Sequence, residues 1–196
     1  QGSAFMPAFP AMYDSALTQR FREGVVTVVD AFALRPHVYK DPDSFLRVVP
    51  KRRFASVVRP ATYPEYMHLR SSSRTVRQLA AFTPFPAFIG KDDSAGSVGL
   101  AVSCNIFVVD GSEKAVMGRL LTEDDCVRGV PAVAVISESI WRARFASNPN
   151  AIGQIIQLNN RPIRIAGVAA DRTTGWTRKT NIWVPFTAQE FFEPGS

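Results

Sequence analysis

The sequence predicts an α+β fold, in which short strands and short helices follow one another along a single chain. Short apolar runs typical of strands alternate with amphipathic stretches typical of helices, most densely between residues 102 and 170. The 14 prolines and 12 glycines indicate many brief elements separated by turns. A chain of 196 residues with 46% hydrophobic residues can bury roughly 70% of its unfolded surface without additional staples.

The N-terminal part of the chain begins irregularly. Gln1-Gly2-Ser3 resembles the remnant of a cleaved expression tag, and residues 4–23 contain prolines and one candidate short helix, Tyr13–Phe21. Phe45–Val49 is typical of a strand, and a basic turn at 50–53 follows it.

A helix is predicted at Thr62–Leu69, because Pro64 is tolerated in the first turn of a helix. The stretches Val76–Phe82 and Phe85–Ile89 are aromatic and are expected to be extended. The Gly- and Ser-containing segment 90–99 follows them and is the best candidate for an internal boundary.

A strand followed by a helix is predicted around residue 137. Ala132–Ile136 is a Val-rich apolar run, and Ser137 is a favourable helix N-cap. Trp141 and Phe145 are four residues apart, so they share the apolar face of the helix. Arg142 and Arg144 then point to water, and Asn148-Pro149 is expected to end the helix.

A hairpin is predicted next. Ile155, Ile156 and Leu158 form one strand, and Ile163, Ile165 and Val168 lie on the returning strand. Asn159-Asn160 between them tolerates positive φ and suits a two-residue turn. The segment 171–180 is expected to be an exposed loop with Trp176 at its centre.

Three consecutive acids end the segment Gly118–Asp125. They could bind a divalent cation, but the alternating ligands and distant Glu of a calcium loop are missing. The favoured interpretation is structural: Thr122 caps a helical turn, the acids lie near its free N–H groups, and Arg119 pairs with one acid.

Cys104 and Cys126 are too few to define a disulfide framework. In an oxidising compartment they could pair, close the loop across Gly118–Asp125 and stabilise the fold by roughly 3 kcal/mol. The alternative is two buried free thiols.

The sequence offers no evident catalytic constellation. His37 and His68 are the two histidines, and no Gly-x-Ser-x-Gly elbow, phosphate-binding Gly-rich loop or paired zinc-ligand spacing occurs. We therefore expect no enzymatic activity, no metal and no cofactor.

The net charge of +6 is compatible with binding to nucleic acid or an anionic surface. The cations are scattered, however, and the tightest cluster, Lys51-Arg52-Arg53, is most simply a solvated loop. A basic binding module is therefore kept as the alternative function. Trp176, with Arg178 and Lys179 beside it, could be a partner contact or could fold back onto the sheet.

Taken in order, several motifs resemble the MacB-like periplasmic core domain of ABC transporter permeases, in the FtsX-like permease superfamily. The matching residues are Val102-Ser103, Asn105, Phe107, Gly118–Asp125, Val133–Ser137, Trp141–Phe145, Ile152-Gly153, Leu158-Asn159, Arg161-Pro162, Gly167-Val168 and Ile182–Pro185. Upstream, Val28–Ala31, Leu34–Pro36, Asp41–Asp43, Leu46–Val48, Tyr63–Tyr66 and Leu79–Phe82 are similar to one branch of these permeases.

The resemblance implies a two-lobed ectodomain. Residues 25–99 would form most of a porter-like, membrane-proximal lobe, and residues 100–186 a small distal α/β lobe. Residues 1–24 would be the tag remnant with an unassigned segment, and 187–196 the end of an excised piece. The longest apolar candidate for a span, Gly24–Leu34, contains Asp30 and is far shorter than the ~20 residues that cross a bilayer.

The resemblance also implies a function without chemistry of its own. The domain would lie on the extracytoplasmic face of the inner membrane and couple movement of permease helices, driven by a cytoplasmic ATPase, to a periplasmic partner or substrate. An adaptor protein, a lipoprotein, a peptide and a second copy of the chain are the partners that it suggests, and nucleic acid is not among them.

Overall fold

The structure is a computed structural model that describes residues 9–12, 26–29, 45–50, 62–74, 76, 78–90, 96–112, 114–171, 180–188 and 191. The chain divides into two compact units, residues 1–82 and 83–196. No helix in these described ranges has the length and apolar character needed to cross a membrane.

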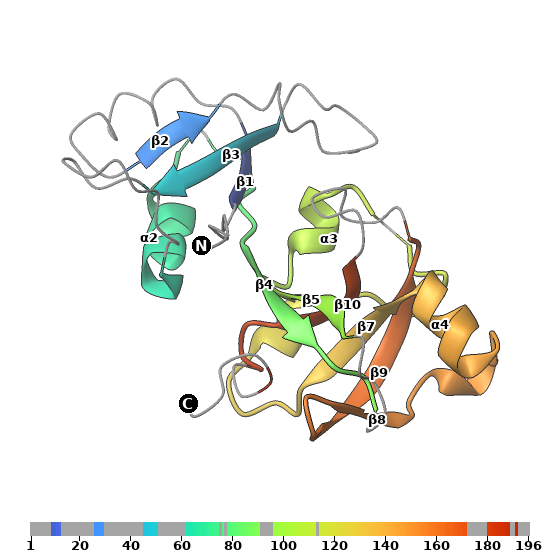
Figure 1. Ribbon diagram of the computed structural model, residues 1–196. Helices are drawn as coiled ribbons and strands as arrows, with labels where there is room; N and C mark the ends of the chain where they lie inside the picture. Colours follow the sequence, from blue (N-terminus) through green and yellow to red (C-terminus); the bar gives the residue numbers. More distant parts are fainter. Residues whose placement is uncertain are drawn as a thin grey trace, which may run out of the picture. The chain divides into compact units, whose positions relative to one another are not determined.

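The first unit contains a small antiparallel sheet (Figure 1). Its central strand is β3 (Phe45–Pro50), which pairs on one side with β1 (Phe9–Met12) and on the other with β2 (Val26–Val29). The strand predicted at Phe45–Val49 is thereby confirmed. The predicted helix Tyr13–Phe21 and the cluster Lys51-Arg52-Arg53 lie outside the described residues.

In the described part of this unit, the helix α2 (Tyr63–Ser72) begins where the sequence predicts. Thr62 is its N-cap, and a reciprocal capping box joins Thr62 to Glu65. Tyr66 is buried, and its hydroxyl donates a hydrogen bond of 3.3 Å to the carbonyl of Leu79. The helix continues three residues beyond the predicted end at Leu69, to Ser72.

The second unit is built on a mixed seven-stranded sheet with the order β4-β5-β10-β7-β9-β6, in which β8 also pairs with β9. Its strands are β4 (Phe82–Ala87), β5 (Ser97–Val102), β6 (Met117–Gly118), β7 (Val133–Ser137), β8 (Ile155–Leu158), β9 (Arg161–Ala169) and β10 (Thr180–Pro185). Strands β5 and β10 are parallel, as are β7 and β9, whereas β10 and β7 are antiparallel. The predicted α+β class is confirmed.

Among the described residues of this unit, four short helical segments accompany the sheet. They are α3 (Ile106–Val109), the 3-10 helix η3 (Glu123–Cys126), α4 (Glu138–Phe145) and the 3-10 helix η4 (Pro149–Ala151). Figure 1 shows α4 beside β7 and β9, in the crossover that joins these two parallel strands.

The strand–helix–hairpin prediction is confirmed from Val133 onward. Ser137 caps α4 by accepting a hydrogen bond of 3.2 Å from the backbone of Ile140. Asn159 and Asn160 have φ values of 50° and 65° and form the turn between β8 and β9. The helix does not reach Asn148, because Ala146 enters the left-handed region and ends it, and Asn148 instead caps η4.

The segment around residue 82 differs from the prediction. One strand, β4, replaces the two extended stretches, and β5 begins at Ser97, inside the predicted loop. Gly99 leaves room for the ring of Phe85 from β4, because a Cβ at this position would lie 2.4 Å from that ring.

The compact units divide after Phe82, and β4 belongs to the sheet of the second unit. The assignment of residues 25–99 and 100–186 to a membrane-proximal and a distal lobe, and of the flanking segments 1–24 and 187–196, stays a prediction.

The core of the second unit lies on the central strands. Ile136, Ile165, Val168, Ile182 and Val184 are almost completely buried in one cluster. Trp141 from α4 joins them, whereas Arg142 and Arg144 are exposed as predicted. Trp183 is fully buried, and its ring meets that of Phe107 edge-on at a centroid distance of 5.8 Å.

Candidate functional site

The candidate site is the strap, residues 122–131, together with the segments that hold it. The chain that leads into the strap starts at β6, which runs antiparallel to β9 with Gly118 opposite Gly167. A Cβ on Gly167 would lie 2.1 Å from the carbonyl oxygen of Arg119, so the two backbones meet closely only because this position is glycine. Arg119 donates from its backbone to the carbonyl of Ala166 at 3.0 Å.

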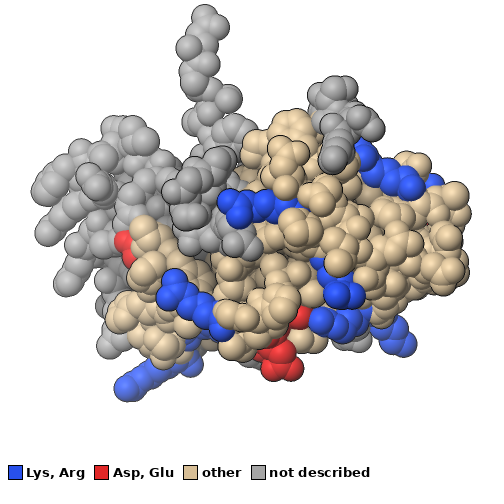
Figure 2. Space-filling model, turned by 90° about the horizontal axis from the view of Figure 1, so that it is seen from below, with Lys and Arg blue, Asp and Glu red and all other residues tan. Residues whose placement is uncertain are grey.

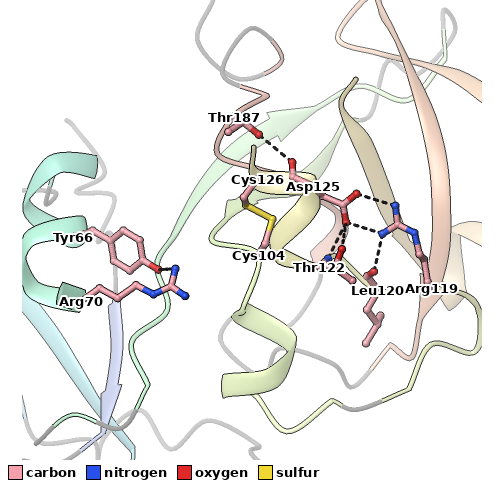
Figure 3. Close-up of a disulfide and its surroundings, with 9 residues drawn as sticks. All are labelled: Tyr66, Arg70, Cys104, Arg119, Leu120, Thr122, Asp125, Cys126 and Thr187. Atoms are coloured by element: carbon pink, nitrogen blue, oxygen red, sulfur yellow. Dashed lines mark hydrogen bonds and ion pairs between the residues drawn. A yellow bond between two sulfur atoms is a disulfide. The ribbon is translucent and has the colours of Figure 1, made fainter. Parts of the chain in front are cut away.

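An ion pair fixes the start of the strap (Figure 3). The guanidinium of Arg119 donates two hydrogen bonds, of 2.6 and 2.8 Å, to the two carboxylate oxygens of Asp125. The backbone N–H of Thr122 donates to the same carboxylate at 2.8 Å. The predicted pairing of Arg119 with an acid is therefore confirmed, and Asp125 is the acid chosen.

The electrostatics of Asp125 follow from this geometry. Burial would by itself raise the pKa of Asp125, but the hydrogen bonds from Arg119 and Thr122 outweigh it and hold that pKa below its ordinary value. The same contact raises the pKa of Arg119. Asp125 is thus a charged acceptor, and both partners are in the ionic form around neutral pH.

A disulfide joins the strap to the end of β5. Cys126 is bonded to Cys104, with the two Cα atoms 6.0 Å apart. Of the two alternatives left open by the sequence, the structure therefore has the disulfide and not two free thiols. The hydroxyl of Thr187, just beyond β10, donates to the carbonyl of Asp125 at 3.2 Å. Since β5 and β10 are parallel neighbours, the strap is attached across the ends of both strands (Figure 3).

This arrangement attaches the strap to the sheet by one covalent bond and several polar contacts. The Asp125 carboxylate is occupied by Arg119 and Thr122, while Glu123 and Asp124 are exposed. Within the described ranges, no group of three or more His, Cys, Asp or Glu side chains converges as metal ligands would. The structural interpretation of the acidic turn is the one that the ion pair supports.

Asn159 is a junction that sequence reasoning assigned only to a turn. Its side-chain amide donates to the carbonyls of Pro86, at 3.0 Å, and Phe191, at 2.6 Å. Its side-chain oxygen accepts from the backbone N–H of Phe88 at 2.8 Å. One residue thus holds the hairpin turn, the end of β4 and the C-terminal segment together, and only its tolerance of positive φ was visible in the sequence.

The N-terminus of α4 is another local junction. Besides the Ser137 cap, the carboxylate of Asp171 accepts a hydrogen bond of 2.7 Å from the backbone of Ser139. This carboxylate satisfies a free N–H group at the positive end of the helix dipole. Asp171 also marks the start of the 171–180 segment, whose residues Trp176, Arg178 and Lys179 lie outside the described residues, so their role as a partner contact stays a prediction.

Of the two histidines, the structure describes His68. His68 is exposed on α2, where its backbone carbonyl accepts from the hydroxyls of Ser71 and Ser72. His37 lies outside the described residues. On the face seen in Figure 2, Lys and Arg side chains are separated by uncharged surface, and acidic side chains lie among them. This distribution lends no support to a basic binding face.

Comparison with known proteins gives one family. The sequence model of the family described as MacB-like periplasmic core domain matches residues 21–195. The match therefore covers the first unit from residue 21 onward and almost all of the second unit.

Individual relatives match shorter segments. A macrolide export ATP-binding/permease protein MacB from Burkholderia thailandensis is 42% identical over 65 residues, which are 32% of this chain and 10% of that protein. The protein of the same name from Aggregatibacter actinomycetemcomitans is 40% identical over 83 residues, which are 41% of this chain and 12% of that protein. The matched segments thus span about a tenth of the curated relatives.

Among solved structures, the periplasmic region of MacB from Actinobacillus actinomycetemcomitans has a similar fold. The TM-score is 0.53 at 22% sequence identity, and the alignment covers 88% of this chain and 71% of that one. At this identity the likeness concerns the fold.

Proposed function

Since the chain belongs to the family of MacB-like periplasmic core domains, we propose that it transmits motion on the extracytoplasmic side of an ABC transporter permease. ATP hydrolysis on a cytoplasmic domain or subunit moves the membrane helices, and this domain passes the movement to a periplasmic partner or substrate. The observation that carries the proposal is the family match over residues 21–195.

The placement outside the cytoplasm is supported by the disulfide. Disulfides persist in oxidising compartments and are rare where thiol buffers keep cysteines reduced. The bond between Cys104 and Cys126 therefore favours an extracytoplasmic location.

The non-catalytic role is supported by the chemistry of the strap. Its buried ionisable group, Asp125, is charged and forms an ion pair with Arg119. The contacts of the Asp125 carboxylate stabilise the conformation of the strap. A domain that transmits force has to keep its conformation under load. The partner is an adaptor, a lipoprotein, a peptide or a second copy of the permease.

The proposal is tested with the full-length transporter and its ATPase. Paired spin labels replace His68, which is exposed on α2 in the first unit, and Gln154, which is exposed before β8 in the second. We expect the distance distribution between these labels to shift when ATP replaces ADP. A matched pair at Arg142 and Gln154, both exposed in the second unit, is the control and should not shift.

Two results would contradict the proposal. An unchanged distribution for the His68–Gln154 pair during active turnover would show that the units do not move with the ATPase cycle. Labelling of Gln154→Cys in intact cells by a membrane-impermeant maleimide tests the location separately, and protection from the reagent would place the domain on the wrong side.

A further inference from the structure

We propose that the disulfide is a redox-controlled latch on the strap, at which a dithiol reductant attacks Cys126 and displaces Cys104. This inference goes beyond the proposed function and does not depend on it. It rests on how the strap is attached, on which of its cysteines is accessible, and on what remains when the covalent bond is removed.

The strap is a surface segment with few inward-facing residues. Eight of its ten residues are exposed, Cys126 is half-buried, and Asp125 is the one buried residue. Val127 and Val130 are 53% and 43% exposed, so they contribute little apolar burial. The backbone hydrogen bonds of Asp125, Val127 and Val130 close turns within the strap itself. A segment with so little apolar burial opens locally at low cost unless specific ties hold it.

The ties are of unequal strength. The ion pair to Arg119 involves a guanidinium that is 50% exposed, so solvent weakens it. The hydrogen bond from Thr187 has the modest net value of a single neutral contact. The disulfide is the covalent attachment, and its removal leaves the strap held by non-covalent contacts. The state of this one bond therefore controls the opening of the strap.

The two cysteines are not equally accessible. Cys104 is 2% exposed and lies between β5 and α3, beside the buried residues Ser103 and Ile106. Cys126 belongs to the exposed strap and is only half-buried. Thiol–disulfide exchange needs an attacking thiolate to reach one sulfur, with the other sulfur as the leaving group. Access therefore favours attack at Cys126, with Cys104 as the leaving group.

The exchange is balanced as follows. A thiolate of the dithiol forms a bond to Sγ of Cys126 while the bond to Cys104 breaks, and Cys104 departs with the electron pair and takes a proton from water. The second thiol of the reductant then attacks its own partner sulfur, which releases Cys126 as a thiolate. The dithiol supplies both electrons and ends as a disulfide.

The first measurement identifies the sulfur that is attacked. The oxidised 196-residue chain is treated without denaturant with 2-mercaptoethanol, a neutral monothiol that cannot resolve its own adduct, and free thiols are then alkylated. Peptide mass spectrometry should find the adduct on Cys126 and the alkyl group on Cys104, in at least tenfold excess over the reverse. An excess of adduct on Cys104, or no reaction until the protein is denatured, would overturn the proposal.

The second measurement tests the opening by hydrogen exchange. After reduction with dithiothreitol, amides of residues 122–131 should exchange at least tenfold faster and independently of low urea concentrations, as expected for local opening, whereas those of β7, β9 and β10 should exchange through global unfolding and keep its full urea dependence. The Cys104→Ser/Cys126→Ser chain provides the same comparison without reductant, and reduced wild type substitutes for it if this variant fails to fold. Thr187→Val in the oxidised chain is the matched control and should leave the strap slow.

Exchange in residues 122–131 that rises with urea as steeply as exchange in β7, β9 and β10 would show that the bond stabilises the whole fold rather than latching a strap. Unchanged exchange in residues 122–131 would show that the polar ties suffice. Either outcome refutes the latch but leaves the spin-label test of force transmission unaffected.

Discussion

The strap and the central strands of the second unit are stabilised by different kinds of interaction. The strap is exposed along most of its length and is attached by a disulfide, an ion pair and a hydroxyl hydrogen bond. Strands β7, β9 and β10 carry residues such as Ile136, Ile165 and Trp183, which are at most 1% exposed. Burial couples these strands into one cooperative body, whereas the ties of the strap act locally and can be removed one by one.

The largest effect is expected at the centre of the sheet. Trp183→Ala removes a fully buried ring and its edge-on contact with Phe107, and should lower the free energy of unfolding by about 3–5 kcal/mol. Urea denaturation followed by circular dichroism measures this change. Trp183→Phe keeps most of the apolar contact and should cost clearly less; equal losses in the two variants would show that the cavity is not the cause.

The disulfide should come next. Replacing both cysteines in Cys104→Ser/Cys126→Ser releases the loop between them and should cost roughly 3 kcal/mol, since the cross-link no longer restricts the unfolded chain. Comparing the urea midpoints of oxidised and reduced wild type gives an independent value. A double variant as stable as the oxidised chain would mean that the bond adds nothing to stability.

Loss of the ion pair should have a smaller effect. Asp125→Asn keeps the shape of the side chain but removes the charge that accepts from Arg119 and Thr122, and should cost about 1.5–3 kcal/mol at pH 7. Arg128→Gln alters an exposed side chain of the strap and is the control, with an expected change within about 0.5 kcal/mol.

The loss of stability caused by Asp125→Asn should depend on pH. Because the folded-state pKa of Asp125 is lowered, its charge contributes stability above the unfolded pKa of about 3.9, and this contribution is lost as the pH falls through the lower folded value. The stability difference between wild type and Asp125→Asn should therefore narrow in urea titrations below about pH 4. A gap that stays constant down to pH 2 would assign the loss to packing instead.

The smallest effect is expected at the hairpin turn. Asn159→Gly preserves the positive φ of 50° but deletes the side-chain bonds to Pro86, Phe88 and Phe191, and should cost about 1 kcal/mol. Asn159→Ala loses the favourable backbone conformation as well and should cost more. Thermal unfolding of Asn159→Gly and Asn159→Ala separates the contribution of the side-chain hydrogen bonds from that of the backbone conformation, and Asn160→Gly is the control for the turn. Equal losses of stability in the two Asn159 variants would exclude a role for the backbone conformation.

Local patterns predicted most of the second unit. The apolar run before Ser137, the spacing of Trp141 and Phe145, and the Asn159-Asn160 turn each depend on neighbours within a few residues. The end of α4 was predicted three residues too late, because the left-handed Ala146 has no distinct sequence signal. The helix α2 was predicted from Thr62 and Pro64, and its extra turn was not.

Contacts over long sequence distances were beyond such patterns. The choice between a disulfide and two free thiols requires the separation of Cys104 and Cys126 in space. The bond from Thr187 to the strap, and the reach of Asn159 to Pro86 and Phe191, join segments that only the sheet order brings together.

The sequence by itself determined the α+β class, the helix caps, the hairpin turn and the family, because these depend on local spacing and on the order of motifs along the chain. Tertiary structure decided which acid Arg119 would hold, that the two cysteines would meet, and that the second unit would begin near residue 83. The physical reason is that parallel pairing of β5 with β10 places the ends of distant strands side by side, and no local pattern encodes that neighbourhood.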